Sequence, residues 1–289
     1  MPKSRSRKPK RSDSHLDQGA IEEAESLREA IAAFREKAET DPRGLAADFI
    51  EMAWDEPDDQ VAQDLALDAL KFDPLCSDAL VILADQLDDD EPERLDLLET
   101  ALGMAVQAMG ERALERFAGR FGTAPETLPY LRARLYLAEA HSLRGEFAEA
   151  MRHFTGILDL WPSETLRVRT LATLALFELN DLDELERLLR RYPDEPSASW
   201  AYNWALLSFR RGGRGVAAQA HLSAALKRNR FAAEYLIGTR TFPKSASVDQ
   251  LPGSRGEGQL YALDHLDVWQ DTPGALDWLR DSLKAAGEI

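Results

Sequence analysis

Apolar residues recur every three or four positions along most of this chain, in segments separated by short polar or glycine-containing stretches. The range 18–39 is typical, because its apolar residues follow this spacing and Thr40-Asp41-Pro42 ends it; they are Ile21, Leu27, Ala30, Ile31 and Phe34. Such spacing gathers apolar side chains on one face of an α-helix. The pattern predicts an all-α protein in which helices dominate as far as Thr239.

Turn-forming and small residues recur at a fixed distance. Gly145 and Gly213 each lie in a turn before a helix, 68 residues apart, which is twice 34. Five positions after each glycine stands a small residue, Ala150 or Ala218, where it lets the second helix of a pair approach the first. Helix pairs with a 34-residue period are typical of tetratricopeptide (TPR) solenoids.

The repeat predicts a TPR-like, right-handed helical solenoid of about five helix pairs. We expect the pairs in residues 43–74, 75–108, 131–162, 166–193 and 199–230. The fourth pair departs from the pattern, because Leu185 stands where the small residue is expected. The range 111–121 is predicted to extend a helix that Gly119, Gly122 and Pro125 break.

The two ends of the chain differ from the repeats. Residues 1–17 are rich in Ser, Lys and Arg, and we expect a disordered tail followed by the solenoid in residues 18–241. Residues 242–258 contain two Pro and three Gly, which predicts an irregular loop. Helices are predicted over 259–269 and 274–285, the second with Thr272 as its N-cap. We expect residues 242–289 to cap the apolar face of the last repeat.

Charge divides the chain in the same way. The formal net charge is −16, yet the first 11 residues carry six basic side chains and no acidic one. The remaining residues hold 29 basic against 51 acidic side chains, so they would repel nucleic acid phosphates. Any nucleic-acid contact is therefore expected only through the basic N-terminal tail.

The chain lacks the sequence marks of a membrane or secreted protein and of a catalytic or metal site. No uncharged run reaches the length of a membrane-spanning helix, and no apolar stretch follows the basic start, so we expect a cytoplasmic protein. Cys76 is the single cysteine, which excludes a disulfide within the chain. The five histidines lack metal-ligand spacing, and no phosphate-loop or nucleophile-elbow motif is present. We expect no enzyme, cofactor, metal or small-molecule substrate.

The first helix of each pair provides the candidate binding surface. In the register set by the repeat, one strip along the concave face receives Arg132, Glu139, Arg167, Thr170, Trp200, Asn203 and Arg210. Trp, Asn and Arg along one concave strip are consistent with a peptide-binding groove, since Trp and Arg are enriched among residues that carry binding energy. A competing interpretation is that these residues only make contacts between repeats.

Several stretches carry a more particular resemblance. They are residues 77–85, 131–150, 176–192 and, most specifically, 229–238 with Tyr261-Ala262-Leu263, Trp269 and 274–279. Over roughly residues 60–282 the chain resembles the suppressor of tumorigenicity seven protein family and its bacterial TPR relatives. It departs from that family in having no membrane segment and in Arg255-Gly256, where an acidic stretch is usual. The resemblance implies a TPR-like fold and no catalytic residue.

Together these patterns predict a non-enzymatic scaffold that binds an unidentified protein or peptide partner through its concave face. The alternative is a regulatory or nucleic-acid-associated accessory protein that uses the basic N-terminal tail.

Overall fold

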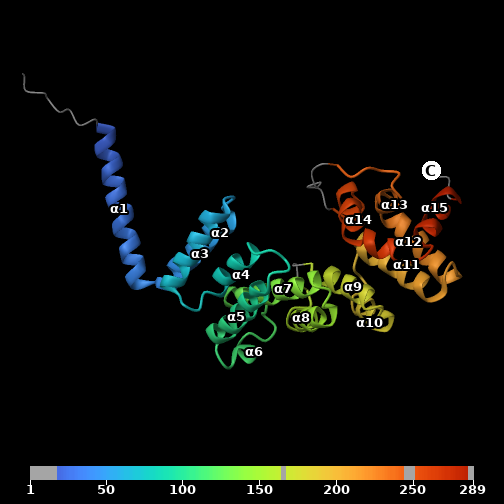
Figure 1. The fold of residues 1–289 in the computed structure, drawn as a ribbon, viewed down its shortest axis with the longest axis horizontal. Helices are drawn as coiled ribbons and strands as arrows, with labels where there is room; N and C mark the ends of the chain where they lie inside the picture. Colours follow the sequence, from blue (N-terminus) through green and yellow to red (C-terminus); the bar gives the residue numbers. More distant parts are fainter. Residues whose placement is uncertain (1–17, 164–166, 244–250, 286–289) are drawn as a thin grey trace, which may run out of the picture.

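The computed structural model describes residues 18–163, 167–243 and 251–285, with the backbone alone for 18–25. These residues form fifteen α-helices and a short 3-10 helix, and no strand occurs among them. Figure 1 shows the helices side by side along one long axis. The predicted all-α class is therefore confirmed for the described residues. The expected disorder of residues 1–17 lies outside them.

Most helices pack in adjacent pairs, as expected for a helical solenoid. The pairs are α2 (Pro42–Asp55) with α3 (Asp59–Phe72), α4 (Ser77–Asp85) with α5 (Pro92–Met109), α7 (Leu128–Leu143) with α8 (Phe147–Leu160), α9 (Val168–Glu178) with α10 (Leu182–Arg191), and α11 (Ala198–Gly212) with α12 (Val216–Arg228). These ranges follow the segments that the sequence repeat predicts.

The small residues lie where the helices of a pair approach closely. Ala150 and Ala218 are both buried completely or nearly so, and the turns before them place Gly145 and Gly213 at positive φ. In the irregular fourth pair Asn180 takes the positive φ instead, at 52°. Asn tolerates this left-handed conformation better than most residues. Leu185 is fully buried there, so the larger side chain is accommodated.

Two helices connect or extend the pairs in an unexpected way. The predicted helix over 111–121 is wrong in length, because α6 covers only Ala113–Arg116, and the 3-10 helix Pro125–Thr127 follows. Gly110, Gly119 and Gly122 all have positive φ, which interrupts a helix at each point.

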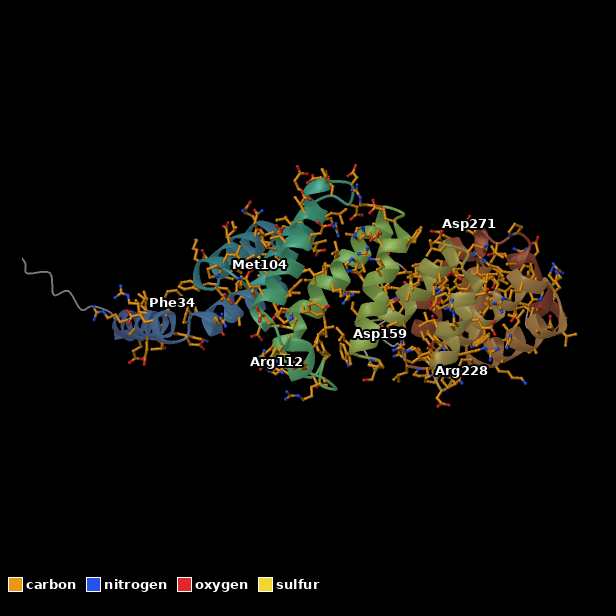
Figure 2. All side chains as sticks on the ribbon, turned by 90° about the horizontal axis from the view of Figure 1, so that it is seen from below. Phe34, Met104, Arg112, Asp159, Arg228 and Asp271 are labelled. Carbon is orange, nitrogen blue, oxygen red and sulfur yellow. The ribbon has the colours of Figure 1, made fainter. Side chains whose placement is uncertain are left out.

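At the N-terminal end of the described chain, α1 (Gln18–Thr40) projects away from the remaining helices, as the position of Phe34 in Figure 2 shows.

Apolar packing is uneven along the chain. One large cluster of buried side chains runs from Met109 to Leu283. Two smaller clusters are separate from it: the first lies among α2, α3 and α4, and the second among α4, α5 and α7. On α1, Leu27, Ile31 and Phe34 remain exposed by 43% or more. The C-terminal two thirds therefore hold the continuous core.

The first of the two predicted C-terminal helices begins earlier than expected. After α13 (Arg230–Leu236), α14 covers Arg255–Gln270 and α15 covers Ala275–Ala285. Ser254 caps α14 by accepting the backbone N–H of Glu257 at 3.1 Å, and Glu257 in turn accepts the N–H of Gly253 at 2.7 Å. This Ser-x-x-Glu pattern resembles a capping box, with the Glu257 carboxylate on the N–H of Gly253 instead of Ser254. It starts the helix at 255 instead of the predicted 259.

The predicted N-cap of the last helix is also wrong. The Thr272 hydroxyl donates to the Val268 carbonyl at 2.7 Å and accepts from Arg210, so it is engaged away from the start of α15. Gly274, at φ 80°, instead precedes the helix, and its carbonyl accepts the Trp278 N–H.

Candidate functional site

The seven residues predicted to line the concave face do lie on the first helices of successive pairs. Arg132 and Glu139 belong to α7, Arg167 and Thr170 to the start of α9, and Trp200, Asn203 and Arg210 to α11. We call this surface the inner strip. The structure divides it into two ends with different surroundings.

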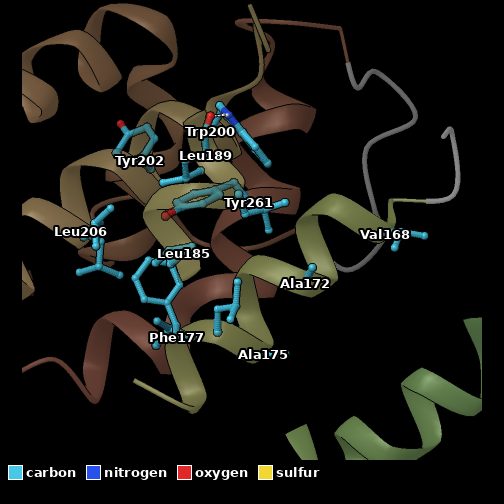
Figure 3. Close-up of a cluster of buried hydrophobic side chains, with 14 of the residues drawn as sticks. Val168, Ala172, Ala175, Phe177, Leu185, Leu189, Trp200, Tyr202, Leu206 and Tyr261 are labelled. Atoms are coloured by element: carbon cyan, nitrogen blue, oxygen red, sulfur yellow. Dashed lines mark hydrogen bonds between the residues drawn. The ribbon is translucent and has the colours of Figure 1, made fainter. Parts of the chain in front are cut away.

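At the C-terminal end, α14 of the same chain lies on the inner strip. This helix contacts both α9 and α11. Figure 3 shows its Tyr261 among buried side chains of those helices, near Trp200 and Tyr202. Five of the seven predicted residues therefore meet the chain's own helix or the core beneath it.

Asn203 is the centre of a buried polar network that holds α14. Its amide donates to the Thr173 hydroxyl at 2.9 Å, and its carbonyl oxygen accepts the Tyr261 hydroxyl at 3.4 Å. The Trp269 indole N–H donates to the Tyr261 hydroxyl oxygen at 2.9 Å. Since Asn203 and Trp269 are fully buried, these hydrogen bonds replace water that the groups have lost.

Trp200 lies against the core instead of facing an open groove. Only 4% of its surface is exposed, its indole N–H donates to the Leu189 carbonyl at 3.2 Å, and its ring meets Tyr192 edge to face. The expectation that Trp200 and Asn203 line an open groove is corrected here, because α14 and the neighbouring helices cover both. No sequence signal in α11 indicates this cover.

The two arginines at this end also bind α14 or the turn after it. Arg167 pairs with Asp264, whose pKa burial raises while Arg167 opposes the rise. Arg210 donates to the Thr272 hydroxyl at 2.8 Å and to the Phe177 carbonyl at 2.7 Å.

A small cleft of about 250 Å³ remains between α9, α11 and α14. Arg167, Thr170 and Trp200 line it together with acidic residues that already have partners. Arg169 pairs with Glu195 at 2.5 Å, and Glu257 accepts the backbone N–H of Ala198 at 2.8 Å. Its charges are therefore largely satisfied within the chain.

The N-terminal end of the inner strip is open. A groove of about 530 Å³ lies between α2, α4, α5 and the start of α7, and Arg132 is one of its walls. Arg132 forms a two-pronged ion pair with the buried Asp78, and the Nε–Oδ1 distance is 2.9 Å. We call this feature the open groove.

The open groove combines an apolar lining with an acidic rim. Its apolar lining includes Ala46, Ala47, Ile50, Trp54, Leu75, Ala105, Ala108, Pro125, Leu128 and Pro129. Trp54 is 38% exposed and contacts Tyr136 with ring centroids 6.0 Å apart. Sequence reasoning missed the walls from α2 and α5, because it placed the surface on the first helices near the middle of the chain.

Glu139 lies farther along the same strip, half-buried. Among the described residues it has no hydrogen-bonding or ion-pair partner. Burial raises the pKa of its carboxyl, and the nearby Asp85 carboxylate raises it further. Arg167 and Arg94 oppose this rise in the pKa of Glu139.

The single cysteine in the open groove is not prepared for catalysis. Burial raises the pKa of the Cys76 thiol to about 11, and Asp78 and Asp73 contribute to the increase. At neutral pH the group is a thiol, whereas nucleophilic cysteines need a lowered pKa. Within the described ranges, no three His, Cys, Asp or Glu side chains are placed to hold a metal ion.

No helix in the part of the chain that the structure describes is both long and apolar enough to cross a bilayer. Comparison of the sequence with models of known protein families gives no match, and neither does comparison with curated proteins.

Proposed function

We propose that the chain is a non-enzymatic, TPR-like scaffold that binds a protein or peptide partner in the open groove between α2, α4, α5 and α7. The observation that carries this proposal is the groove itself, which joins an apolar lining and an exposed tryptophan. Exposed apolar surface of this kind, rimmed by polar residues, is typical of interaction sites.

The other end of the inner strip supports the same proposal. There the surface accepts a helical segment, α14, through an aromatic side chain and two arginine contacts. A segment from another molecule can use the open end in a similar manner. Of the seven predicted residues we keep Arg132 and Glu139 for that partner, since the other five serve α14 and the core.

Direct selection of ligands tests the proposal. Peptides selected from a random display library on the purified full chain are measured by titration calorimetry against Ala108→Trp and Ala47→Trp. Both alanines are exposed and line the groove from different helices, α2 and α5, so the added indole fills the groove without entering the core. We expect affinity to fall by a factor of about 10 or more, corresponding to about 1.4 kcal/mol.

Val216→Trp is the matched control, because Val216 is 90% exposed and lies outside the groove. Binding that survives both groove variants, or that is lost equally in the control, would refute the site.

The alternative role, contact with nucleic acid, depends on the six basic side chains of the first 11 residues. It predicts binding to duplex or single strands that weakens steeply with salt. Membership of the suppressor of tumorigenicity seven family, the right-handed TPR superhelix and the cytoplasmic location also remain predictions.

A further inference from the structure

The open groove has an excess of unpaired negative charge. Two of its acidic residues are paired, Asp78 with Arg132 and Asp73 with Arg43 at 4.0 Å. The other three, Glu51, Asp55 and Glu126, form no ion pair within the described residues. A ligand that fits the apolar lining and also carries positive charge would therefore complement this groove best.

The covered end of the inner strip follows the same rule with opposite sign. There the strip supplies Arg167 and Arg210. Helix α14 supplies Asp264, and the turn after it supplies the hydroxyl of Thr272. The covered end thus matches its charge to the segment that lies on it.

We propose that the basic N-terminal segment of the same chain docks in the open groove and competes there with the external partner. The inference rests on the proposed function for the competition, but the docking itself depends only on the groove. Lys3, Arg5, Arg7 and Lys8 supply the charges, opposite Glu51, Asp55 and Glu126.

The chain is long enough for this contact. Helix α1 has 23 residues and so spans about 34 Å at 1.5 Å per residue. An extended chain covers about 3.4 Å per residue, so residue 6 can reach about 41 Å from Gln18 and residue 14 only about 14 Å. Phe34 on α1 meets Phe49 on α2 with ring centroids 6.4 Å apart, so the path from Gln18 to Trp54 follows about 24 Å of α1, this contact and about 8 Å of α2.

Tethering makes a weak contact effective. A linker that can span its sites gives an effective concentration of about 1 mM. Suppose that the free segment binds the groove with a dissociation constant of about 0.1 mM. Its effective concentration then exceeds this constant about tenfold, so it lowers the apparent affinity of an external partner about tenfold. Because the contact is largely electrostatic and lies at a solvent-exposed rim, it should weaken as salt rises.

Contact quenching by tryptophan tests the docking in the full chain. Cys76→Ala leaves no thiol, and Ser6→Cys then provides a single site for a bimane label. We expect the emission of this label to be quenched by Trp54 and restored by Trp54→Phe. Emission should also return in the triple variant Glu51→Gln, Asp55→Asn, Glu126→Gln, and in 0.5 M salt.

Ser14→Cys is the matched label position, since residue 14 reaches only about 14 Å beyond Gln18, and its label should stay bright throughout. An unquenched Ser6 label, or quenching unaffected by Trp54→Phe, would overturn the proposal. Quenching that increases with protein concentration would also overturn it, because the occupant would then be the tail of a second copy.

The competition is measured separately from the docking. Replacing Lys3, Arg5, Arg7 and Lys8 by Gln should tighten binding of a selected groove peptide about tenfold. Peptide binding that is blocked by Ala108→Trp but unchanged by these replacements leaves the proposed function standing and refutes the tail. Quenching without any selectable peptide refutes the partner and leaves the tail.

Discussion

Replacing Trp269 by Ala should release α14 from the inner strip. The side chain is fully buried, and its rings approach Tyr202 and Trp278 at centroid distances of 6.3 and 6.4 Å. Truncating a buried tryptophan to alanine costs about 3–5 kcal/mol. The variant also removes the 2.9 Å hydrogen bond to the Tyr261 hydroxyl, worth about 1 kcal/mol. We therefore expect a local loss of about 4–6 kcal/mol.

The magnitude is comparable with the whole stability of many domains, about 5–15 kcal/mol. In a linear array of helix pairs, however, each unit contacts mainly its neighbours, so the loss should remain local. Hydrogen exchange by mass spectrometry should show lost protection in α13, α14 and α15, with α2–α5 unchanged. Urea unfolding followed by circular dichroism should show an early first transition.

Trp54→Ala is the control, because Trp54 is 38% exposed; it should cost about 1 kcal/mol or less. A loss below about 1 kcal/mol in Trp269→Ala, or unchanged exchange in α14, would refute the reasoning. It would mean that α14 is an appendage and that the inner strip is open along its whole length.

Three further predictions concern the helix packing, the groove wall and the buried histidine. Ala150→Leu and Ala218→Leu should each lower stability by about 1–3 kcal/mol in thermal melts, because both sites lie fully packed between two helices. Arg132→Met should cost about 2 kcal/mol in urea titrations, since it leaves the buried Asp78 carboxylate without its partner, and Asp78→Asn in that background should restore part of the loss. Burial lowers the pKa of His265 from 6.5 to about 3, so as the pH falls the imidazole takes up a proton in the unfolded chain before it does so in the folded one. The free energy of unfolding should therefore drop by about 1.4 kcal/mol per pH unit below pH 6.5. His265→Leu should reduce that slope.

Each of these has an outcome that contradicts it. Ala148 is exposed on the same helix as Ala150, and an equal effect of Ala148→Leu would disprove the assigned register. An unchanged midpoint in Arg132→Met would show that Asp78 reaches water without its partner. A pH dependence that is identical with and without His265 would show that its ring is protonated in the folded protein.

The sequence by itself determined the helices and their pairing. The helical spacing of apolar residues, the small residues and the glycines all act over a few positions. Gly145 with Ala150, and Gly213 with Ala218, therefore suffice to place a turn and a close helix crossing. It also assigned Arg132, Arg167, Asn203 and the other strip residues to the first helices of their pairs, because the helix boundaries follow from the local pattern.

What covers that side was decided only by the tertiary structure. The contact between Asn203 and Tyr261 joins positions 58 apart, and that between Arg167 and Asp264 joins positions 97 apart. No local pattern encodes such distances, since they depend on how a distant helix docks. The open groove has the same origin, because its walls come from four helices that meet only in the folded chain.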